Sequence, residues 1–154
     1  MKEYPYRKMN EMREILEVLQ MPSKLKNTRT ILTLLAVARV KEKSKWSQVE
    51  ESYARTHDMI VFMNEYYPNK GGTDLKRGGY SENSRETIRD DSVSPLCSMA
   101  VMEHNGAKSQ SEKSSYRLTK EFATLLRAYG TENWEEELCY YCLLYTSDAA
   151  DDRI

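Results

Sequence analysis

The segment from Asn27 to Val40 constrains the fold most, because its apolar residues are too dense for a helix with a single buried face. Asn27 or Thr28 can cap a helix at this point. The apolar positions that follow are Ile31, Leu32, Leu34, Leu35, Val37 and Val40. A helix that is hydrophobic on most sides has to be covered by other elements. The sequence therefore predicts a helix surrounded by the rest of the domain.

Three further segments have the apolar spacing of amphipathic helices. The first runs from Asn10 to Leu19 and ends at Met21-Pro22, and another runs from about residue 57 to 67 and ends before Pro68. A later helix is capped by Thr119 and closed by Gly130. Their apolar positions are Met12, Ile15, Leu16 and Leu19; Met59, Ile60, Phe62, Met63 and Tyr66; and Phe122, Leu125, Leu126 and Tyr129.

Residues 68–118 contain a fourth helix and two short strands. The glycine-rich stretch 68–82 is a loop by composition. Asn83 fits the N-cap of a capping box with Glu86, so a helix is expected to run from there to about residue 93, before Pro95. Residues 96–102 and 116–118 are the predicted strands, with a reversal signal at residues 105–106. The element order predicts a mainly α protein with a small β-hairpin, in the arrangement of a winged helix-turn-helix.

Length, charge and hydropathy limit the class of protein. The 154 residues suit one domain. Residues 1–130 carry 22 Lys and Arg against 17 Asp and Glu, whereas residues 131–154 carry one Arg against seven acids. A mildly basic body fits an anionic partner and, equally well, an ordinary solvated surface. No apolar stretch is long enough to span a bilayer and no signal peptide is visible, so we expect a cytoplasmic protein with no membrane partner.

The sequence has no pattern that predicts a catalytic or metal-binding site. Its three cysteines cannot all pair with one another, and we expect free thiols. Cys139 and Cys142 have CxxC spacing, but no second ligand pair accompanies them. Asp74, Leu75 and Lys76 form an acid-x-Lys triplet in a loop, without the clustered carboxylates that a Mg²⁺-dependent nuclease needs. We therefore expect no catalytic residue, no metal ligand and no cofactor in this chain.

The front of the predicted fourth helix is rich in hydrogen-bond donors. A recognition helix enters the major groove with its N-terminal residues, where such donors contact bases and phosphates. The candidate DNA contacts on the helix are Asn83, Ser84, Arg85, Thr87 and Arg89, and those on the hairpin are Lys108, Ser109, Gln110 and Lys113. An ordinary capped surface helix would also explain the first group.

Two neighbouring acids argue against DNA binding. Arg85 and Arg89 are four residues apart and share one helix face, while Ile88 is expected to point toward the core. Asp90 and Asp91 would repel phosphates unless they face away from DNA or pair with Arg89.

Five stretches, in this order and spacing, carry a family resemblance. "MREILEVLQMP", "NTRTILTLLAVARV", "KWSQVEES", "NSRETIR" and "LLRAYGTENWEEEL" resemble the N-terminal helix-turn-helix region of the PstI/BsuBI family of type II restriction endonucleases. The resemblance covers roughly residues 10–138. It implies a DNA-binding region that precedes a magnesium-dependent catalytic domain, and a palindromic target cut by a homodimer. No residues remain here for that second domain.

The end of the chain resembles something else. "CLLYTSDAAD", residues 142–151, resembles one reading frame of a transposase sequencing adapter. We therefore expect a winged helix-turn-helix domain over residues 1–141 and a non-native tail over residues 142–154. If residues 142–154 are non-native, the rest of the chain is the N-terminal part of a truncated endonuclease.

The first interpretation is thus a module that binds duplex DNA and belongs to a truncated type II restriction endonuclease. Its full-length parent would be a Mg²⁺-dependent site-specific deoxyribonuclease, but the fragment itself would lack the catalytic domain. Two alternatives stay open: a free-standing winged-helix transcription regulator, and a helical protein-interaction domain.

Overall fold

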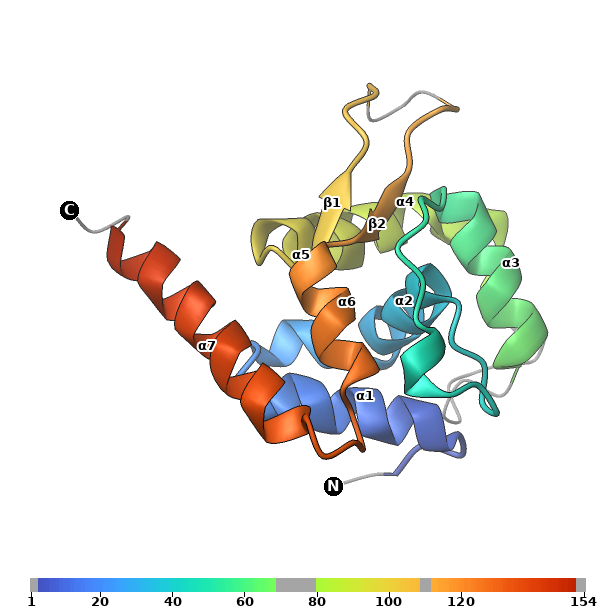
Figure 1. Ribbon diagram of the computed structural model, residues 1–154. Coiled ribbons are helices and arrows are strands. Elements are labelled where there is room, and N and C mark those ends of the chain that lie inside the picture. Colours follow the sequence, from blue (N-terminus) through green and yellow to red (C-terminus); the bar gives the residue numbers. More distant parts are fainter. Residues whose placement is uncertain (1–2, 69–79, 109–111, 152–154) are drawn as a thin grey trace.

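The computed structural model describes residues 3–68, 80–108 and 112–151, which form a mainly helical domain with a small antiparallel hairpin, as predicted (Figure 1). Its helices and strands are α1 (Arg7–Val18), α2 (Thr28–Ala38), α3 (Thr56–Tyr66), α4 (Arg85–Ile88), α5 (Ser94–Ser98), β1 (Met102–His104), β2 (Tyr116–Leu118), α6 (Lys120–Arg127) and α7 (Trp134–Asp151). Within the described ranges, no helix is both long enough and apolar enough to cross a bilayer.

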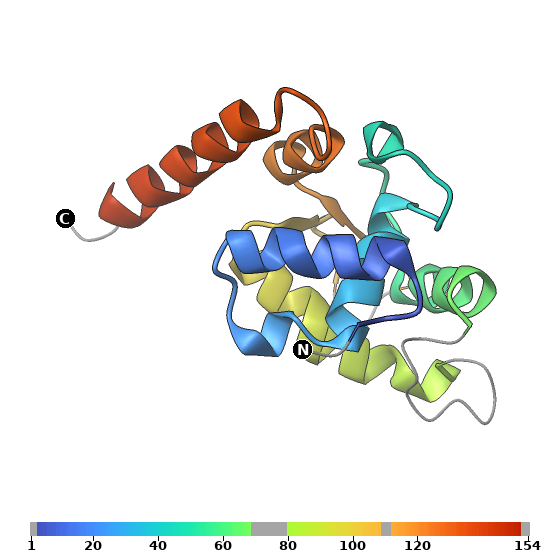
Figure 2. The same ribbon diagram turned by 90° about the horizontal axis from the view of Figure 1, so that it is seen from below.

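The helix α2 lies at the centre of the core, as its apolar density predicts. Every residue from Thr30 to Ala38 is buried. The Asn27 side chain accepts a hydrogen bond from the Thr30 backbone N–H at 2.8 Å, which confirms the predicted cap. Both α1 and α3 contact α2, and Figure 2 shows α1 lying across it. The first three predicted helices are therefore confirmed.

Two polar contacts fix the C-terminal end of α3. The buried Tyr67 hydroxyl donates a hydrogen bond to the Val40 carbonyl at 2.6 Å, so α3 ends against the end of α2. The Asn64 side chain donates to the Tyr80 carbonyl at 2.7 Å and accepts from the Tyr80 backbone N–H at 2.8 Å. This second contact fixes the position at which the chain approaches α4.

Residues 82–98 form one helical stretch that differs from the prediction at both ends. A 3-10 turn (Glu82–Ser84) leads into α4, and the Ser84 N–H donates to the Ser81 carbonyl. The predicted side-chain cap at Asn83 is wrong, because Asn83 lies inside this turn and α4 begins at Arg85 without a side-chain cap. The predicted end near residue 93 is also wrong. A π turn (Arg89–Val93) places Pro95 in the first turn of α5, where its missing N–H breaks no helical bond.

The hairpin follows this stretch, and its first strand begins later than predicted. Residues 96–98 are helical, and β1 starts only at Met102, because a short apolar run does not distinguish a strand from a buried helix. The second predicted strand is confirmed as β2, which pairs with β1 so that Met102 lies opposite Leu118. Ala54, in the link between α2 and α3, forms a one-residue bridge to Tyr116 with bonds of 2.7 and 2.9 Å.

Two helices complete the chain. Thr119 caps α6 as predicted, since its hydroxyl accepts a bond from the Phe122 N–H at 3.3 Å. The helix α7 was not predicted. It runs through residue 142, the expected start of the tail, and Figure 1 shows it extending away from the body. Tyr141 is buried with its ring centroid 5.9 Å from that of Phe122, whereas Leu143 is 60% exposed.

Candidate nucleic-acid interface

The helical stretch 82–98 is anchored by its apolar side and presents polar groups on its outer side. Its fully buried apolar residues are Ile88, Val93 and Leu96, so the prediction that Ile88 faces the core is confirmed. Of the predicted DNA contacts on this stretch, Asn83, Arg85 and Thr87 are exposed, and Ser84 and Arg89 are partly exposed. The stretch therefore brings all five side chains to within two turns of one another at its front end.

The π turn is held by a buried polar contact that sequence reasoning did not find. The hydroxyls of Ser92 and Thr30 are 2.9 Å apart, and the Arg29 Nε donates to the same Ser92 oxygen at 3.0 Å. Ser92 and Thr30 are fully buried. Since a buried hydroxyl needs its hydrogen bonds, this contact fixes the rotation of the stretch relative to α2. Ser92 stands between Asp91 and Val93 in a polar stretch, and nothing in that local sequence predicts a buried contact with α2.

The two acids that opposed the DNA-binding interpretation have different surroundings. The Arg89 Nε donates to an Asp90 carboxylate oxygen at 3.0 Å, so one of the two pairings considered from the sequence is present. This hydrogen bond and the charge of Asp90 raise the pKa of the Arg89 guanidinium, which stays cationic. Asp91 and Glu86 are exposed on the same stretch. Its outer side therefore carries both signs of charge.

The hairpin arms are tied together beyond the last strand pair. The His104 Nε2 lies 2.7 Å from the Ser114 hydroxyl. The Asn105 side chain donates to the Lys113 carbonyl at 2.6 Å and to the Ser115 hydroxyl at 2.9 Å. Such cross-arm bonds stiffen a two-stranded element that would be marginally stable alone. These hydrogen bonds hold the two arms of the hairpin together between the strands and the tip.

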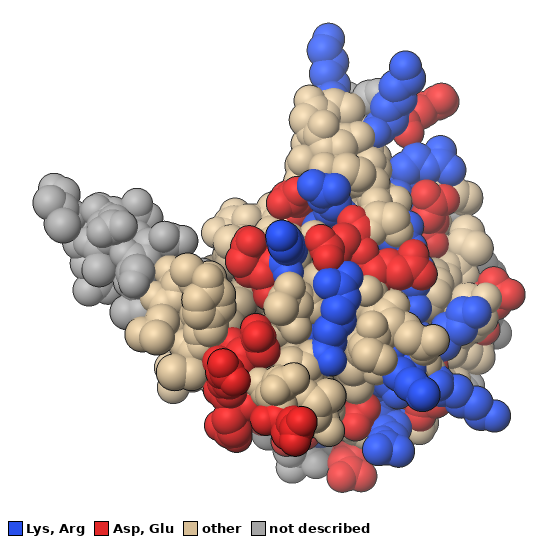
Figure 3. Space-filling model, in the orientation of Figure 1, with Lys and Arg blue, Asp and Glu red and all other residues tan. Residues whose placement is uncertain are grey.

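Basic side chains gather at the tip of the hairpin. Of the predicted hairpin contacts, Lys108 and Lys113 are exposed, while Ser109 and Gln110 lie outside the described residues. Figure 3 shows basic side chains projecting at the top of the hairpin, with an acidic group beside them, above a body where acidic and basic groups alternate. In Figure 1 the helical stretch passes behind the foot of the hairpin, and α5 contacts β1 there. The two predicted groups therefore belong to neighbouring elements.

Lower on the hairpin, a basic residue is already engaged. Arg117 forms a salt bridge with Glu103 at 2.7 Å across the two strands, and its guanidinium lies over the Tyr53 ring at 4.5 Å from the centroid. This pairing leaves the lysines of the tip as the more accessible cations of the hairpin.

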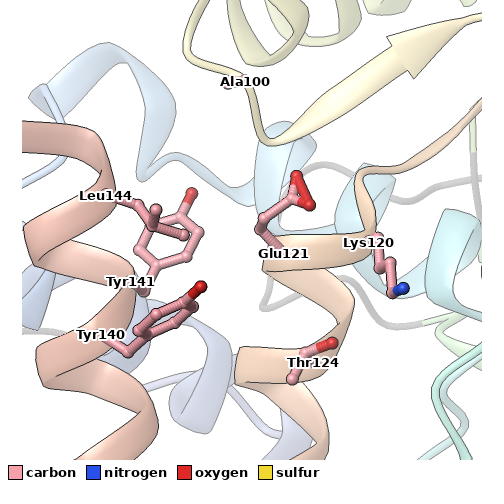
Figure 4. A pocket seen from close by; sticks show the side chains of 7 residues that line it. All are labelled: Ala100, Lys120, Glu121, Thr124, Tyr140, Tyr141 and Leu144. Carbon is pink, nitrogen blue, oxygen red and sulfur yellow. The ribbon is translucent and has the colours of Figure 1, made fainter. Parts of the chain in front are cut away.

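A pocket of about 490 Å³ lies between α6 and α7. In Figure 4, Tyr141 and Leu144 from α7 point toward Glu121 of α6, and Ala100 closes one side. None of the predicted DNA-contacting residues lines it. Across the described ranges, no three His, Cys, Asp or Glu side chains gather in a way that could hold a metal ion.

Comparisons with known proteins agree with this architecture. The family model described as the BsuBI/PstI restriction endonuclease HTH domain matches residues 6–148, which includes most of α7. The type II restriction enzyme BsuBI of Bacillus subtilis is 27% identical over 132 residues, which cover 83% of this chain and 39% of BsuBI. The chain thus spans about two fifths of that relative.

A solved structure shows the same fold. The structure of SdaI restriction endonuclease superimposes with a TM-score of 0.75 at 21% sequence identity, covering 87% of this chain and 40% of SdaI. The family match over nearly the whole chain and the shared fold lead to one conclusion: the protein belongs to the BsuBI/PstI restriction endonuclease HTH domain family.

Proposed function

We propose that this domain is the DNA-binding module of a type II restriction endonuclease, and that it docks on duplex DNA as a winged helix-turn-helix. The front of the stretch 82–98 would enter the major groove, and the hairpin would act as the wing against the backbone. The observation that carries the proposal is the buried anchoring of this stretch on α2, which leaves its donor-rich front exposed beside a braced arm with a basic tip.

The bridge at Ala54 supports the winged arrangement. It adds the link between α2 and α3 to the edge of the hairpin through two backbone bonds with Tyr116. The hairpin is therefore joined both to the helices that precede the recognition stretch and to α5, and the wing cannot pivot freely with respect to the reading helix.

The contacts divide by chemistry. Asn83, Ser84, Arg85, Thr87 and Arg89 are proposed to contact bases and the nearby backbone, because side-chain amides and guanidinium groups match base-edge acceptors in the major groove. Lys108, Ser109, Gln110 and Lys113 are proposed to contact phosphates. The Arg85→Ala variant should then lose discrimination among sequences, whereas Lys113→Ala should weaken binding to all sequences alike.

The activity of a longer parent is a further proposal. BsuBI is a type II restriction enzyme, and 39% of its length aligns with this domain. We infer that such a parent cuts a palindromic duplex with Mg²⁺ as a homodimer, and that its catalytic groups lie outside the region that this domain represents. The non-native origin of residues 142–154 stays a prediction.

Salt-dependent binding tests the proposal. Each phosphate contact releases condensed counterions, so affinity for a fluorescently labelled duplex should fall steeply between roughly 50 and 200 mM salt. Replacing Lys108 and Lys113 with alanine should lower the slope of log K against log salt by about two. Lys43→Ala is the matched control, because Lys43 is also exposed and the neighbouring Glu42 accepts hydrogen bonds from the start of α1.

Failure of the wild-type domain to bind duplex DNA even at low salt would reject the proposal. One observation favours a second candidate in that case. Glu86, Asp90 and Asp91 are all exposed on the outer side of the recognition stretch, and carboxylates there suit a basic protein partner. A helical protein-interaction domain would then be the better explanation.

A further inference from the structure

Arg89 and Asp90 form an ion pair between neighbouring residues at the surface of the stretch 82–98. The Arg89 Nε–H donates a hydrogen bond to the Asp90 carboxylate at 3.0 Å. The Nη atoms of the guanidinium carry four further N–H donors. The side chain of Arg89 is 25% exposed and that of Asp90 is 61% exposed, so the pair lies at the surface rather than in the core.

Such a pair matches one base better than the other three. Guanine presents the acceptors O6 and N7 side by side in the major groove, and a guanidinium can donate to both. A free arginine loses side-chain rotamer freedom when it makes this contact. A carboxylate that already binds the guanidinium reduces this loss of rotamer freedom. It also disfavours a competing contact between the guanidinium and a DNA phosphate.

We propose that Arg89 reads a guanine of the target and that Asp90 is a specificity-determining residue that holds Arg89 in position. The inference rests on the proposed function, because it requires this stretch to enter the major groove. It also explains an acid on a DNA-binding surface: Asp90 weakens the attraction to phosphates in general while it improves discrimination at one base.

The neighbouring acid provides a matched control. Asp91 follows Asp90 directly and is exposed, yet its side chain makes no hydrogen bond or ion pair with any residue that the structure describes. Asp90→Asn and Asp91→Asn remove the same charge from the same stretch. Both should therefore strengthen non-specific DNA binding to a similar extent. Only Asp90→Asn should alter the choice of sequence.

Selection from a random duplex library tests this, because the library contains every short target sequence. The wild-type domain and Asp91→Asn should select the same site. Asp90→Asn should lose preference for one guanine in that site. Arg89→Lys should lose preference at the same position, because it keeps the charge but cannot donate as a planar fork.

A modified base then identifies the contact. Replacing that guanine with 7-deazaguanine removes the N7 acceptor and should weaken wild-type binding by about tenfold. The effect on Asp90→Asn should be much smaller. Thermal unfolding of each variant should match the wild type, since both carboxylates are exposed.

The outcomes distinguish failure of this inference from failure of the proposed function. Selection of an unchanged site by Asp90→Asn would overturn the inference, and so would equal relaxation by Asp91→Asn. Sequence-independent binding by the wild type, with no guanine selected, would overturn it too. Absence of any binding to duplex DNA would instead reject the proposed function.

Discussion

Replacing Tyr67 with phenylalanine should destabilise the domain by a predictable amount. The Tyr67 side chain is fully buried, its ring lies edge-on against Tyr6 at 5.1 Å, and its hydroxyl donates to the Val40 carbonyl at 2.6 Å. The substitution keeps the ring and removes only the donor, so the buried carbonyl loses this partner. An unsatisfied buried group costs about 1–3 kcal/mol. For a domain of this size, each kcal/mol lowers the Tm by roughly 2–4 °C.

Urea unfolding would measure this loss as a shift in midpoint at constant slope. Tyr66→Phe is the matched control, because Tyr66 is only partly buried and its hydroxyl makes no hydrogen bond with a described residue. We expect the wild type and Tyr66→Phe to unfold at the same urea concentration, and Tyr67→Phe to unfold at a lower one. Equal midpoints for all three proteins would refute the idea that this bond joins α3 to α2.

The same substitution should change the response to alkaline pH. Burial raises the pKa of Tyr67 above that of an unfolded tyrosine, which is about 10. Above that pH, unfolding releases a proton, so the free energy of unfolding falls as the pH rises. Tyr67→Phe should show a shallower fall. Tyr129, whose pKa burial raises to about 12, contributes to the fall in both proteins. An identical pH profile for variant and wild type would contradict this account.

The cysteines, the C-terminal helix and the lack of a metal-binding cluster among the described residues each allow a shorter test. Burial raises the pKa of Cys97 to about 11, so iodoacetamide near neutral pH should modify the exposed Cys139 and Cys142 first, as mass spectrometry would show; equal rates would contradict this. A chain ending after Cys142 keeps the buried Tyr141 and should retain its Tm, whereas one ending after Leu138 should lose several degrees; no difference between them would mean that Tyr141 adds nothing. Plasmid DNA incubated with the domain and Mg²⁺ should stay intact, and nicking that co-purifies with the chain through every step would disprove that expectation.

The parts of the fold that follow a regular apolar period could be predicted from the sequence. The helices α1, α2, α3 and α6 were predicted because their buried residues recur at helical spacing. The caps at Asn27 and Thr119 were predicted because their side-chain oxygens precede such a segment. The element order and the hairpin followed from these signals.

The parts that depend on tertiary contacts could not be predicted in the same way. The π turn exists where Ser92 meets Thr30 and Arg29, which are about sixty residues away in the sequence. Without that contact, Pro95 is correctly expected to end a helix. The helix α7 is different, because Trp134, Leu138 and Tyr141 recur at helical spacing and its acidic first turn is typical of a helix N-terminus, so this helix could have been predicted.

The candidate site shows the same division. Exposure of Arg85, Lys108 and Lys113 was expected from their polarity and is present. The pairing of Arg89 with Asp90 was one of two possibilities that the sequence left open, and only the backbone geometry of the stretch decides between them. Which of these groups touches a base depends on the docked position of DNA.

The double hydrogen bond between Asn64 and Tyr80 has a consequence for how relatives of this domain can diverge. It joins residue 64 to residue 80, so the chain reaches the start of the recognition stretch at a fixed point, whatever number of residues lies between. Doubling the length of a loop whose ends are already pinned costs only about 0.6 kcal/mol. Insertions and deletions between residues 68 and 80 should therefore be tolerated readily. The recognition stretch would keep its place while that segment changes in length.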